Sequence, residues 1–517
     1  MGAGVAEFPS LLVSPDLFTH CGKLNGRRWS GQSLFQAWVA HLGDLPLHLS
    51  CSDPGFIRSL KPLLLRAGHS GELRSHGLVD PEPYAQIGGL FIPDPSLGTW
   101  ARWRQTVGAA SFSLIGQIHT LNTPAALGYL EALASEPIHP WDAVICSSTA
   151  GRAVVESVFA DRENQLQHRF CCATPLPRPQ LPVIPLPVPV EAMQQALPGQ
   201  VQAREAFGIP AAAHVVLWLG RLSMLTKVDP WPTYQILQRL ALELSQPLWL
   251  IECGADDTPD QALHFQELRQ LCPAVRFLRL GGADPVDEAT KFQALAAADL
   301  AISLVDNCQE TFGLSLIEAM AAGLPVVATD WDGYRDSIRH GVDGFLVPCR
   351  WAPGSQSCSL PLGWQQQLSL LSFPLVAGVL GQLVQLDTAA AGGYLATLFH
   401  NPSLARAMGQ QGRKRAQRLF SGPAVMQQYA ELFGELAQRR QAGADRPSAK
   451  PPLSLDPVRL FGHFASQPSS RPWPDPQGHQ LEPQVAQNRQ GLWQFLLQGL
   501  SAEQSDQLLN QLRRKHL

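Results

Sequence analysis

The chain has 517 residues, of which 45% are hydrophobic and 16% are charged, and its formal net charge is −4. This length exceeds one ordinary hydrophobic core, so we expect about two to four packed domains. The chain lacks the strong basic charge that binding to nucleic acid or to anionic lipid requires, so neither is expected as a main partner.

The ten cysteines are scattered without C-x-x-C pairs, and several lie in apolar runs where a free thiol acts as a small hydrophobe. Reduced thiols and a cytoplasmic location are therefore expected. The N-terminus lacks the basic flank and long apolar core of a signal peptide, and no apolar run reaches the roughly 18 residues of a membrane span. Peripheral contact with a membrane and the oligomeric state stay open.

Residues 1–180 alternate short apolar segments with helical patterns, which predicts a parallel sheet covered by helices. We expect a Rossmann-like domain over this range. The predicted strands lie at 10–16, 45–51, 112–120 and 142–148, and the predicted helices at 33–43 and 123–135.

A proline-rich segment separates this domain from the next. Residues 175–189 hold seven prolines in fifteen positions, which favours extended backbone and forbids a helix. We expect an interdomain linker over residues 181–200.

Strand and helix patterns resume over residues 201–420 and predict a second Rossmann-like domain. Residues 351–380 show no clean periodicity and are interpreted as an insertion. A helix at 421–442 is expected to pack back on the first domain, and 443–517 to form a Pro- and Gln-rich tail with a terminal amphipathic helix. The predicted strands lie at 214–220, 247–254, 275–282, 300–306, 324–330 and 344–349, and the main predicted helices at 234–244, 291–299 and from about 313.

The segment ETFGLSLIEAM places Glu310 and Glu318 in a stretch whose other side chains are nearly all apolar or small. Carboxylates are rarely buried without a partner. A helix starting near Gly313 could hold a diphosphate through its unpaired amides and positive dipole end, with Glu318 about one turn inside to accept ribose hydroxyls. A helix-dipole contact or a core salt bridge is the structural alternative.

The segment GRLSMLTK follows the predicted strand at 214–220 and places two cations on the loop that leaves it. Arg221 can chelate phosphate oxygens with two N–H groups, and Lys227 can supply a point charge. Strand-end loops also carry solvated basic residues, so the two segments indicate an anion site only in combination.

Together these segments resemble the retaining glycosyltransferases of family 4. The similar pattern is G-R-L-x(4)-K, then E-T-F-G-x(4)-E-A-M-A-A-G-x-P-V-V, then G-Y-R-D-x(4)-G-x-D-G-F-L-V, and it covers residues 205–349. The resemblance implies the GT-B fold, in which two Rossmann-like α/β domains face each other across a cleft, here with a C-terminal helical extension. It also implies that 1–180 binds the acceptor and 201–420 a nucleotide-sugar donor.

The resemblance further implies site residues. Arg221 and Lys227 would bind the donor diphosphate and stabilise its departing charge, Glu318 would hold the ribose, and Glu310 would contact the transferred sugar. The remaining implied donor contacts are the backbone amides of Phe312, Gly313 and Leu314.

In the first domain, the resemblance implies that His119 faces the donor sugar from a strand end and that Gly31, at a helix start, touches phosphate or acceptor. Because Arg221 and Lys227 supply the positive charge, no metal or other cofactor is expected. Whether Glu310 positions the sugar or acts as a nucleophile stays open.

The leading hypothesis is thus a retaining glycosyltransferase that moves a sugar from a nucleotide-diphosphate sugar to a hydroxyl of a glycan, lipid or small molecule. The alternatives are another GT-B enzyme such as a nucleotide-sugar epimerase, or a non-catalytic GT-B-like binding or scaffold protein. The nucleotide base, the sugar and the acceptor are not specified by these residues.

Overall fold

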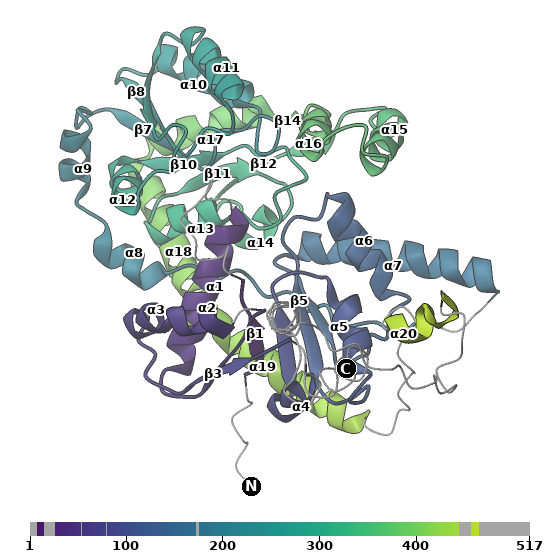
Figure 1. Ribbon diagram of the computed structural model, residues 1–517. Helices are drawn as coiled ribbons and strands as arrows, with labels where there is room; N and C mark the ends of the chain where they lie inside the picture. Colours follow the sequence, from purple (N-terminus) through teal and green to yellow (C-terminus); the bar gives the residue numbers. More distant parts are fainter. Residues whose placement is uncertain are drawn as a thin grey trace, which may run out of the picture.

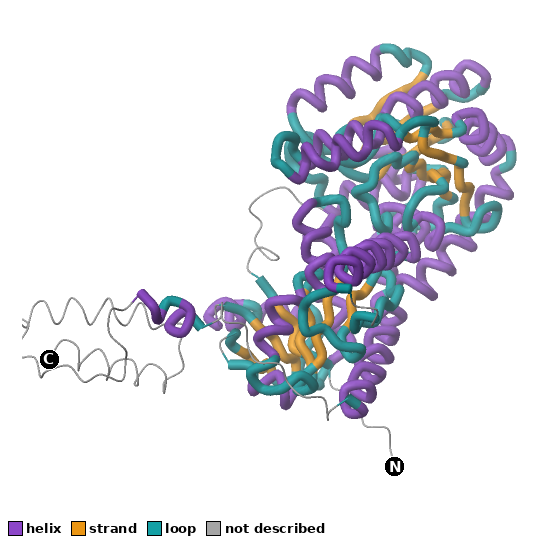
Figure 2. The backbone as a smooth tube through the Cα atoms, turned by 90° about the vertical axis from the view of Figure 1, so that its right-hand side faces the viewer, coloured by secondary structure: helices purple, strands orange, loops and turns teal. Residues whose placement is uncertain are grey.

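The computed structural model describes residues 8–14, 26–52, 54–78, 80–171, 175–443 and 456–464. The amphipathic helix predicted near the end of the chain lies outside these residues. Within them the chain forms two parallel six-stranded sheets, each with helices on both faces, and one small antiparallel pair of strands. Figure 2 shows the two sheets as separate groups of strands, one above the other.

The first sheet has the strand order β3-β2-β1-β4-β5-β6, and all its pairs are parallel. Its strands are β1 (Ser10–Leu12), β2 (Leu47–Ser50), β3 (Leu73–His76), β4 (Gly89–Ile92), β5 (Ser113–Gln117) and β6 (Ala143–Ile145). Its helices are α1 (Gly26–Leu42), α2 (Pro54–Ser59), α3 (Lys61–Arg66), α4 (Glu82–Ile87), α5 (Leu97–Arg104), α6 (Pro124–Leu133) and α7 (Thr149–Phe170).

The second sheet has the order β12-β11-β10-β7-β8-β9, again all parallel. Its strands are β7 (His214–Leu219), β8 (Leu248–Cys253), β9 (Val275–Leu280), β10 (Leu300–Ser303), β11 (Val326–Thr329) and β12 (Gly344–Val347). The helices up to β12 are α8 (Val190–Ala196), α9 (Gln200–Ala206), α10 (Pro230–Glu243), α11 (Pro259–Gln270), α12 (Glu288–Ala297), α13 (Leu314–Ala321) and α14 (Tyr334–Ser337).

The range predicted as an insertion has secondary structure of its own. It contains β13 (Cys349–Trp351), α15 (Gln356–Gln367), α16 (Phe373–Gly381) and β14 (Val384–Leu386), and β13 pairs antiparallel with β14. The remaining elements are α17 (Thr388–His400), α18 (Pro402–Phe420), α19 (Gly422–Ala442), α20 (Pro457–Leu460) and a 3-10 turn η3 (Gly462–Phe464).

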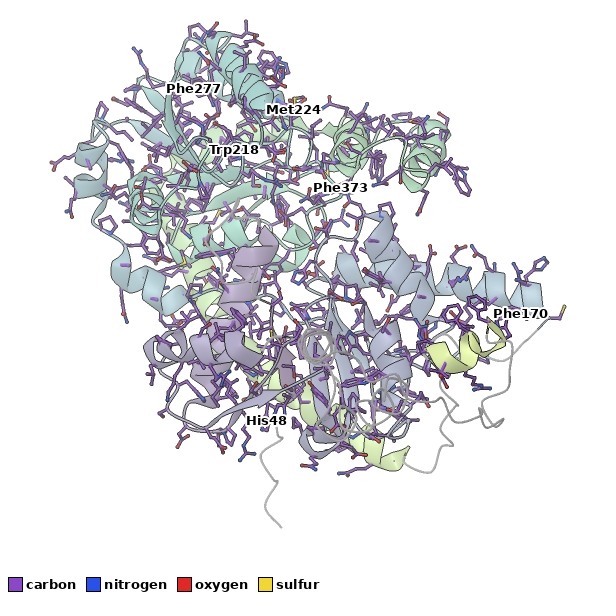
Figure 3. The ribbon with its side chains drawn as sticks, in the orientation of Figure 1. His48, Phe170, Trp218, Met224, Phe277 and Phe373 are labelled. Atoms are coloured by element: carbon purple, nitrogen blue, oxygen red, sulfur yellow. The ribbon has the colours of Figure 1, made fainter. Side chains whose placement is uncertain are left out.

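The central strands of both sheets are buried on both faces, which explains why they are continuous apolar runs, whereas the edge strands β3 and β9 are partly exposed and carry polar side chains. All five residues of β5 are buried, and so are most of those in β7. Aromatic side chains complete the second core: Trp218 of β7 packs near Tyr234 of α10, which contacts Phe277 of β9. Figure 3 shows Trp218 and Phe277 on the second sheet, and His48 near the outer edge of the first.

The proline-rich segment runs extended beside β6 in the first domain. Backbone hydrogen bonds of 2.9 Å join Val144 N to Gln180 O, Cys146 N to Pro182 O and Ile184 N to Cys146 O. Gln180 N also donates to Asp142 O at 2.7 Å, so the segment both accepts and donates, and its donors are residues other than proline.

Helix α19 belongs to the first core, although it follows the second domain in sequence. Its buried face, which includes Tyr429 and Phe433, packs against Trp38 of α1. The chain therefore crosses between the domains twice, once before α8 and once before α19 (Figure 1). The crossings lie side by side, since Val188 N donates to Phe420 O at 2.8 Å.

The two domains also touch directly. Thr311 Oγ1 donates to the carbonyl of His119 at 2.9 Å, and both the backbone amide and the hydroxyl of Thr149 donate to the carboxylate of Asp336. Thr149 is the first residue of α7, so this carboxylate also meets the positive end of the helix dipole. None of the described helices is both long and apolar enough to cross a bilayer.

Candidate functional site

The candidate site lies at the point where the strand order of the second sheet reverses. Strands β7 and β10 are parallel neighbours, but the chain continues from β7 toward one edge of the sheet and from β10 toward the other. Ligands of open α/β sheets bind outside the carboxyl ends of the strands at such a point. The loop after β7 carries Arg221 and Lys227, and the loop after β10 carries Glu310.

Lys227 and Glu310 meet at this point. Lys227 Nζ lies 2.9 Å from Glu310 Oε2, while the backbone amides of Gly313 and Phe312 donate to Glu310 Oε1 at 3.0 and 3.4 Å. Burial alone would raise the pKa of Glu310, but Lys227 and the two amides outweigh it and hold the pKa below its usual value. The carboxylate is thus bound as an anion at the amino end of α13.

Gly313 makes this geometry possible. It has φ of +93°, and a Cβ added there would lie 2.2 Å from Cε1 of Tyr334. Tyr334 is fully buried, with its hydroxyl 2.9 Å from Ser303 Oγ. Helix α13 begins at Leu314, as the sequence predicts. Because Gly313 has no side chain, its backbone packs directly against the Tyr334 ring, and this position leaves the amides at the start of α13 free to face Glu310.

Arg221 and Glu318 have other partners. Arg221 binds Asp257 at 3.0 Å, and Asp257 also accepts a hydrogen bond from Ser223 Oγ at 2.8 Å. Glu318, buried in the first turns of α13, accepts a bond of 2.8 Å from Lys291 Nζ of α12. Arg221 and Glu318 are therefore each paired with an opposite charge of the protein itself.

Lys291 also links the two domains. Its ammonium lies 4.2 Å from the ring centroid of Trp29, which stands near the start of α1 in the first domain. A cation over an aromatic face is attracted by the ring quadrupole. The chain Trp29–Lys291–Glu318 thus connects α1 to the helix that follows the Glu310 loop.

His119 lies just after β5, as predicted, and its backbone carbonyl contacts Thr311 beside Glu310. Its ring atom Nε2 lies 3.1 Å from the carbonyl oxygen of Pro93. Since a carbonyl only accepts, this contact places a proton on Nε2. The catalytic role of His119 stays a prediction.

The predicted place of Gly31 at a helix start is wrong. Helix α1 begins at Gly26, so Gly31 lies inside it and not in a turn before it. Residues 26–32 lack proline and tolerate helical backbone, and Ser30 is buried. A phosphate contact through a turn at Gly31 has no structural support.

Two further carboxylates line the Glu310 loop. Burial, with the nearby charge of Glu310, raises the pKa of Asp332 to about 8. Burial also raises the pKa of Asp306 to about 7. Both sites therefore favour the neutral acid, whereas the site of Glu310 favours the anion.

This difference predicts a pH dependence of stability. An acid whose folded pKa exceeds its unfolded value destabilises the fold as pH rises from that unfolded value, about 3.9, to the folded one. For Asp332 this loss of folding stability develops between about pH 4 and 8 and is complete above pH 8. We expect Asp332→Asn to lessen the fall of the melting temperature between about pH 4 and 8, because asparagine is neutral and tolerates the left-handed backbone at this position, φ 48°.

The measurement is thermal unfolding against pH, with the exposed Asp44→Asn as control. The control should follow the unchanged protein. Equal pH slopes for Asp332→Asn and the unchanged protein would contradict a raised pKa at Asp332.

Sequence reasoning missed Lys291, Asp257 and Trp29. None stands in a motif, and their partners are set by the spatial order of strands and helices. The one available signal was the expectation that a buried Glu318 needs a cation.

The fold places the chain in a structural class of glycosyltransferases. The structure resembles that of a glycosyltransferase from Rickettsia africae with a TM-score of 0.51 and 12% identity, covering 83% of this chain and 98% of that one. Two Rossmann-like domains with facing carboxyl edges make this a GT-B protein, as predicted.

Sequence comparisons then identify the relatives. Residues 213–354 match the family described as "Glycosyl transferases group 1". A D-inositol 3-phosphate glycosyltransferase of Thermobispora bispora is 26% identical over 300 residues, which are 55% of this chain and 64% of that protein. A phosphatidyl-myo-inositol mannosyltransferase of Mycobacterium leprae is 34% identical over 152 residues, 28% of this chain and 36% of the relative.

The matched regions thus span less than two thirds of these relatives. They confirm the predicted resemblance to family 4: the second domain is like that of a family-4 glycosyltransferase.

Proposed function

We propose that the chain is a retaining glycosyltransferase that moves a sugar from a nucleotide-diphosphate sugar to a hydroxyl of a glycan, lipid or small molecule. The observation that carries this proposal is the binding of the Glu310 carboxylate by Lys227 and by two amides at the start of α13. The ammonium of Lys227 and the amino end of α13 lie where the strand order reverses. Groups that bind a carboxylate there can also bind a diphosphate, which carries more negative charge.

Donor binding then requires an exchange of partners. The diphosphate takes Lys227 and the amides of Phe312 and Gly313, and the released Glu310 carboxylate turns to hydroxyls of the sugar. Glu318, at 5% exposure, accepts the ribose hydroxyls and shares or gives up its bond to Lys291. Arg221 remains near the diphosphate, held by Asp257.

In the reaction, the bond between the anomeric carbon and the phosphate oxygen breaks, and a bond from the acceptor oxygen forms on the same face. The proton of the acceptor hydroxyl goes to the departing phosphate oxygen. Charge grows on the diphosphate during this step, so cations and amides already aimed at it lower the barrier. The products are the glycoside and the nucleotide diphosphate.

The alternatives differ in their products. A nucleotide-sugar epimerase would return a nucleotide-linked sugar, and a scaffold protein would turn over no donor. The family match over residues 213–354 favours the transferase. The cytoplasmic location stays a prediction.

The proposal is tested by thermal shift with UDP-, GDP-, ADP- and dTDP-sugars, followed by release of nucleotide diphosphate with the stabilising donor. A bound donor raises the melting temperature by mass action. NMR of the glycoside should show the donor's anomeric configuration. Absence of nucleotide diphosphate release with every donor and a broad acceptor panel would contradict the transferase.

Glu318→Ala should weaken donor binding. Removing a carboxylate that accepts two hydroxyls costs about 1.5–3 kcal/mol, or roughly ten- to hundredfold in the donor dissociation constant. Calorimetric titration of the donor measures this effect. Glu288→Ala, at an exposed position at the start of α12, is the control and should bind donor normally.

We further propose that transfer needs no divalent metal, because Arg221 and Lys227 supply the positive charge at the diphosphate. Turnover in EDTA should therefore stay within about twofold of turnover with added Mg²⁺. A loss of about tenfold or more that Mg²⁺ restores would contradict this expectation.

A further inference from the structure

The segment from Trp351 to Leu386 contains no Asp, Glu, Lys, Arg or His, although charged residues make up 16% of the chain. It runs from Trp351, the last residue of β13, through α15 and α16 to the end of β14, and is called the 351–386 hairpin below. Its two helices project from the second domain above α6 (Figure 1).

The outer helix of the hairpin exposes large apolar side chains. Helix α15 has no buried residue, and its Leu360 and Trp364 are 67% and 60% exposed. Leu368 and Leu370, between the helices, are 64% and 70% exposed. Single exposed apolar residues are ordinary, but a contiguous group indicates a surface for docking.

The base of the hairpin is fixed to the candidate site. Asn307 Nδ2 donates to the carbonyls of Ala377 in α16, at 3.1 Å, and of Leu225 in the Lys227 loop, at 3.0 Å. Gly378 packs so closely that an added Cβ would lie 2.7 Å from Cδ2 of Leu225. Gln366 of α15 also donates to Asn122 O of the first domain at 3.2 Å. The exposed apolar group therefore stands at the rim of the site.

We propose that the 351–386 hairpin docks on the interface of a zwitterionic lipid bilayer. Its lack of charge matches a surface without net charge, whereas interfaces between proteins are enriched in Arg, which this segment lacks. Leu and Trp are the side chains that enter the headgroup boundary. Helices of 12 and 9 residues are too short to span, so they lie in the interface.

This inference rests on the proposed transferase and narrows its acceptor. If the hairpin at the rim of the site binds the bilayer, the site faces the membrane surface and can reach hydroxyl groups of molecules anchored there. The acceptor is therefore a lipid or a lipid-anchored glycan, and the nucleotide sugar enters from water.

The experiment is co-sedimentation of the full chain with phosphatidylcholine vesicles. We expect binding that changes less than about twofold when roughly 20% phosphatidylserine or 0.5 M NaCl is added, because no charge attraction is involved. Leu360→Gln, Trp364→Gln and Leu368→Gln together should weaken binding about tenfold or more. The triple variant should fold, since α15 buries nothing.

The matched control places three glutamines at exposed leucines elsewhere on the second domain, Leu242, Leu263 and Leu271. It should bind vesicles as the unchanged chain does. Binding that requires anionic lipid, no binding to vesicles, or an unaffected triple variant would overturn the proposal. So would a dimer, seen by light scattering without lipid, that the triple variant dissociates.

Release of nucleotide diphosphate, measured with a panel of both lipid and water-soluble acceptors, separates the two proposals. If the hairpin inference alone fails, the chain turns over donor but ignores vesicles. If the transferase proposal fails, donor turnover is absent while vesicle binding keeps its dependence on the hairpin leucines.

Discussion

Lys227→Met should lower kcat for sugar transfer by about 10²–10³-fold, because one preorganised charge at the departing diphosphate is lost. The donor KM should change less, since charge on the diphosphate grows only as the bond breaks. Steady-state release of nucleotide diphosphate measures both constants. Lys61→Met, at an exposed position of α3, should be unaffected.

A loss of folding could imitate this effect, because the substitution leaves Glu310 without its cation. Glu310 accepts a bond of 2.9 Å from Lys227 and is only 14% exposed. The double variant Lys227→Met with Glu310→Gln removes both charges and should recover the lost thermal stability but not the activity. A Lys227→Met enzyme with normal kcat would exclude Lys227 from catalysis.

Gly313→Ala should destabilise the second domain by about 2–4 kcal/mol, through left-handed backbone strain and overpacking. Its φ is +93°, and the new methyl would meet the buried Tyr334 ring at 2.2 Å. Donor binding should fall as well, since the amides of Phe312 and Gly313 must shift. Denaturant unfolding and donor titration check the two effects.

Gly341→Ala is the matched control for backbone strain. Gly341 has φ of +75°, but no atom lies within 4 Å of an added Cβ. The control should cost only about 1 kcal/mol and leave donor binding intact. If both variants lose the same stability, the Tyr334 contact does not constrain the helix start.

The second domain was the more predictable part of the fold. Each of its six strands coincides with a predicted strand, and the central ones are continuous apolar runs because both their faces are covered, as HVVLWL in β7 illustrates. The start of α13 at Leu314 was also predicted, from Gly313 and the small apolar residues that follow.

The first domain was harder to predict because its elements are less apolar. Strand β3 (LRSH) lies at the sheet edge and is polar, so it lacks the apolar pattern of a buried strand. Strand β4 (GLFI) is apolar and buried and was missed all the same. Helix α7 was missed because only three of its 22 residues are buried. In the 351–386 hairpin, Pro361 and the lack of a buried face remove the usual helical pattern.

The site was predicted as a set of residues but not as a set of contacts. Lys227 and Glu310 are 83 positions apart and meet because β10 lies beside β7, an order that local patterns do not encode. The pairing of Glu318 with Lys291, and of Arg221 with Asp257, depends on the same strand order. The roles of these residues in transfer stay predictions.

The double crossing between the domains limits how they can move. Val188 and Phe420 tie the outgoing and returning segments together by a backbone hydrogen bond, so both strands of the connection bend at one place. We expect such a joint to act as a hinge between the domains. The Trp29–Lys291 contact, which joins different domains, would then form and break with the hinge motion.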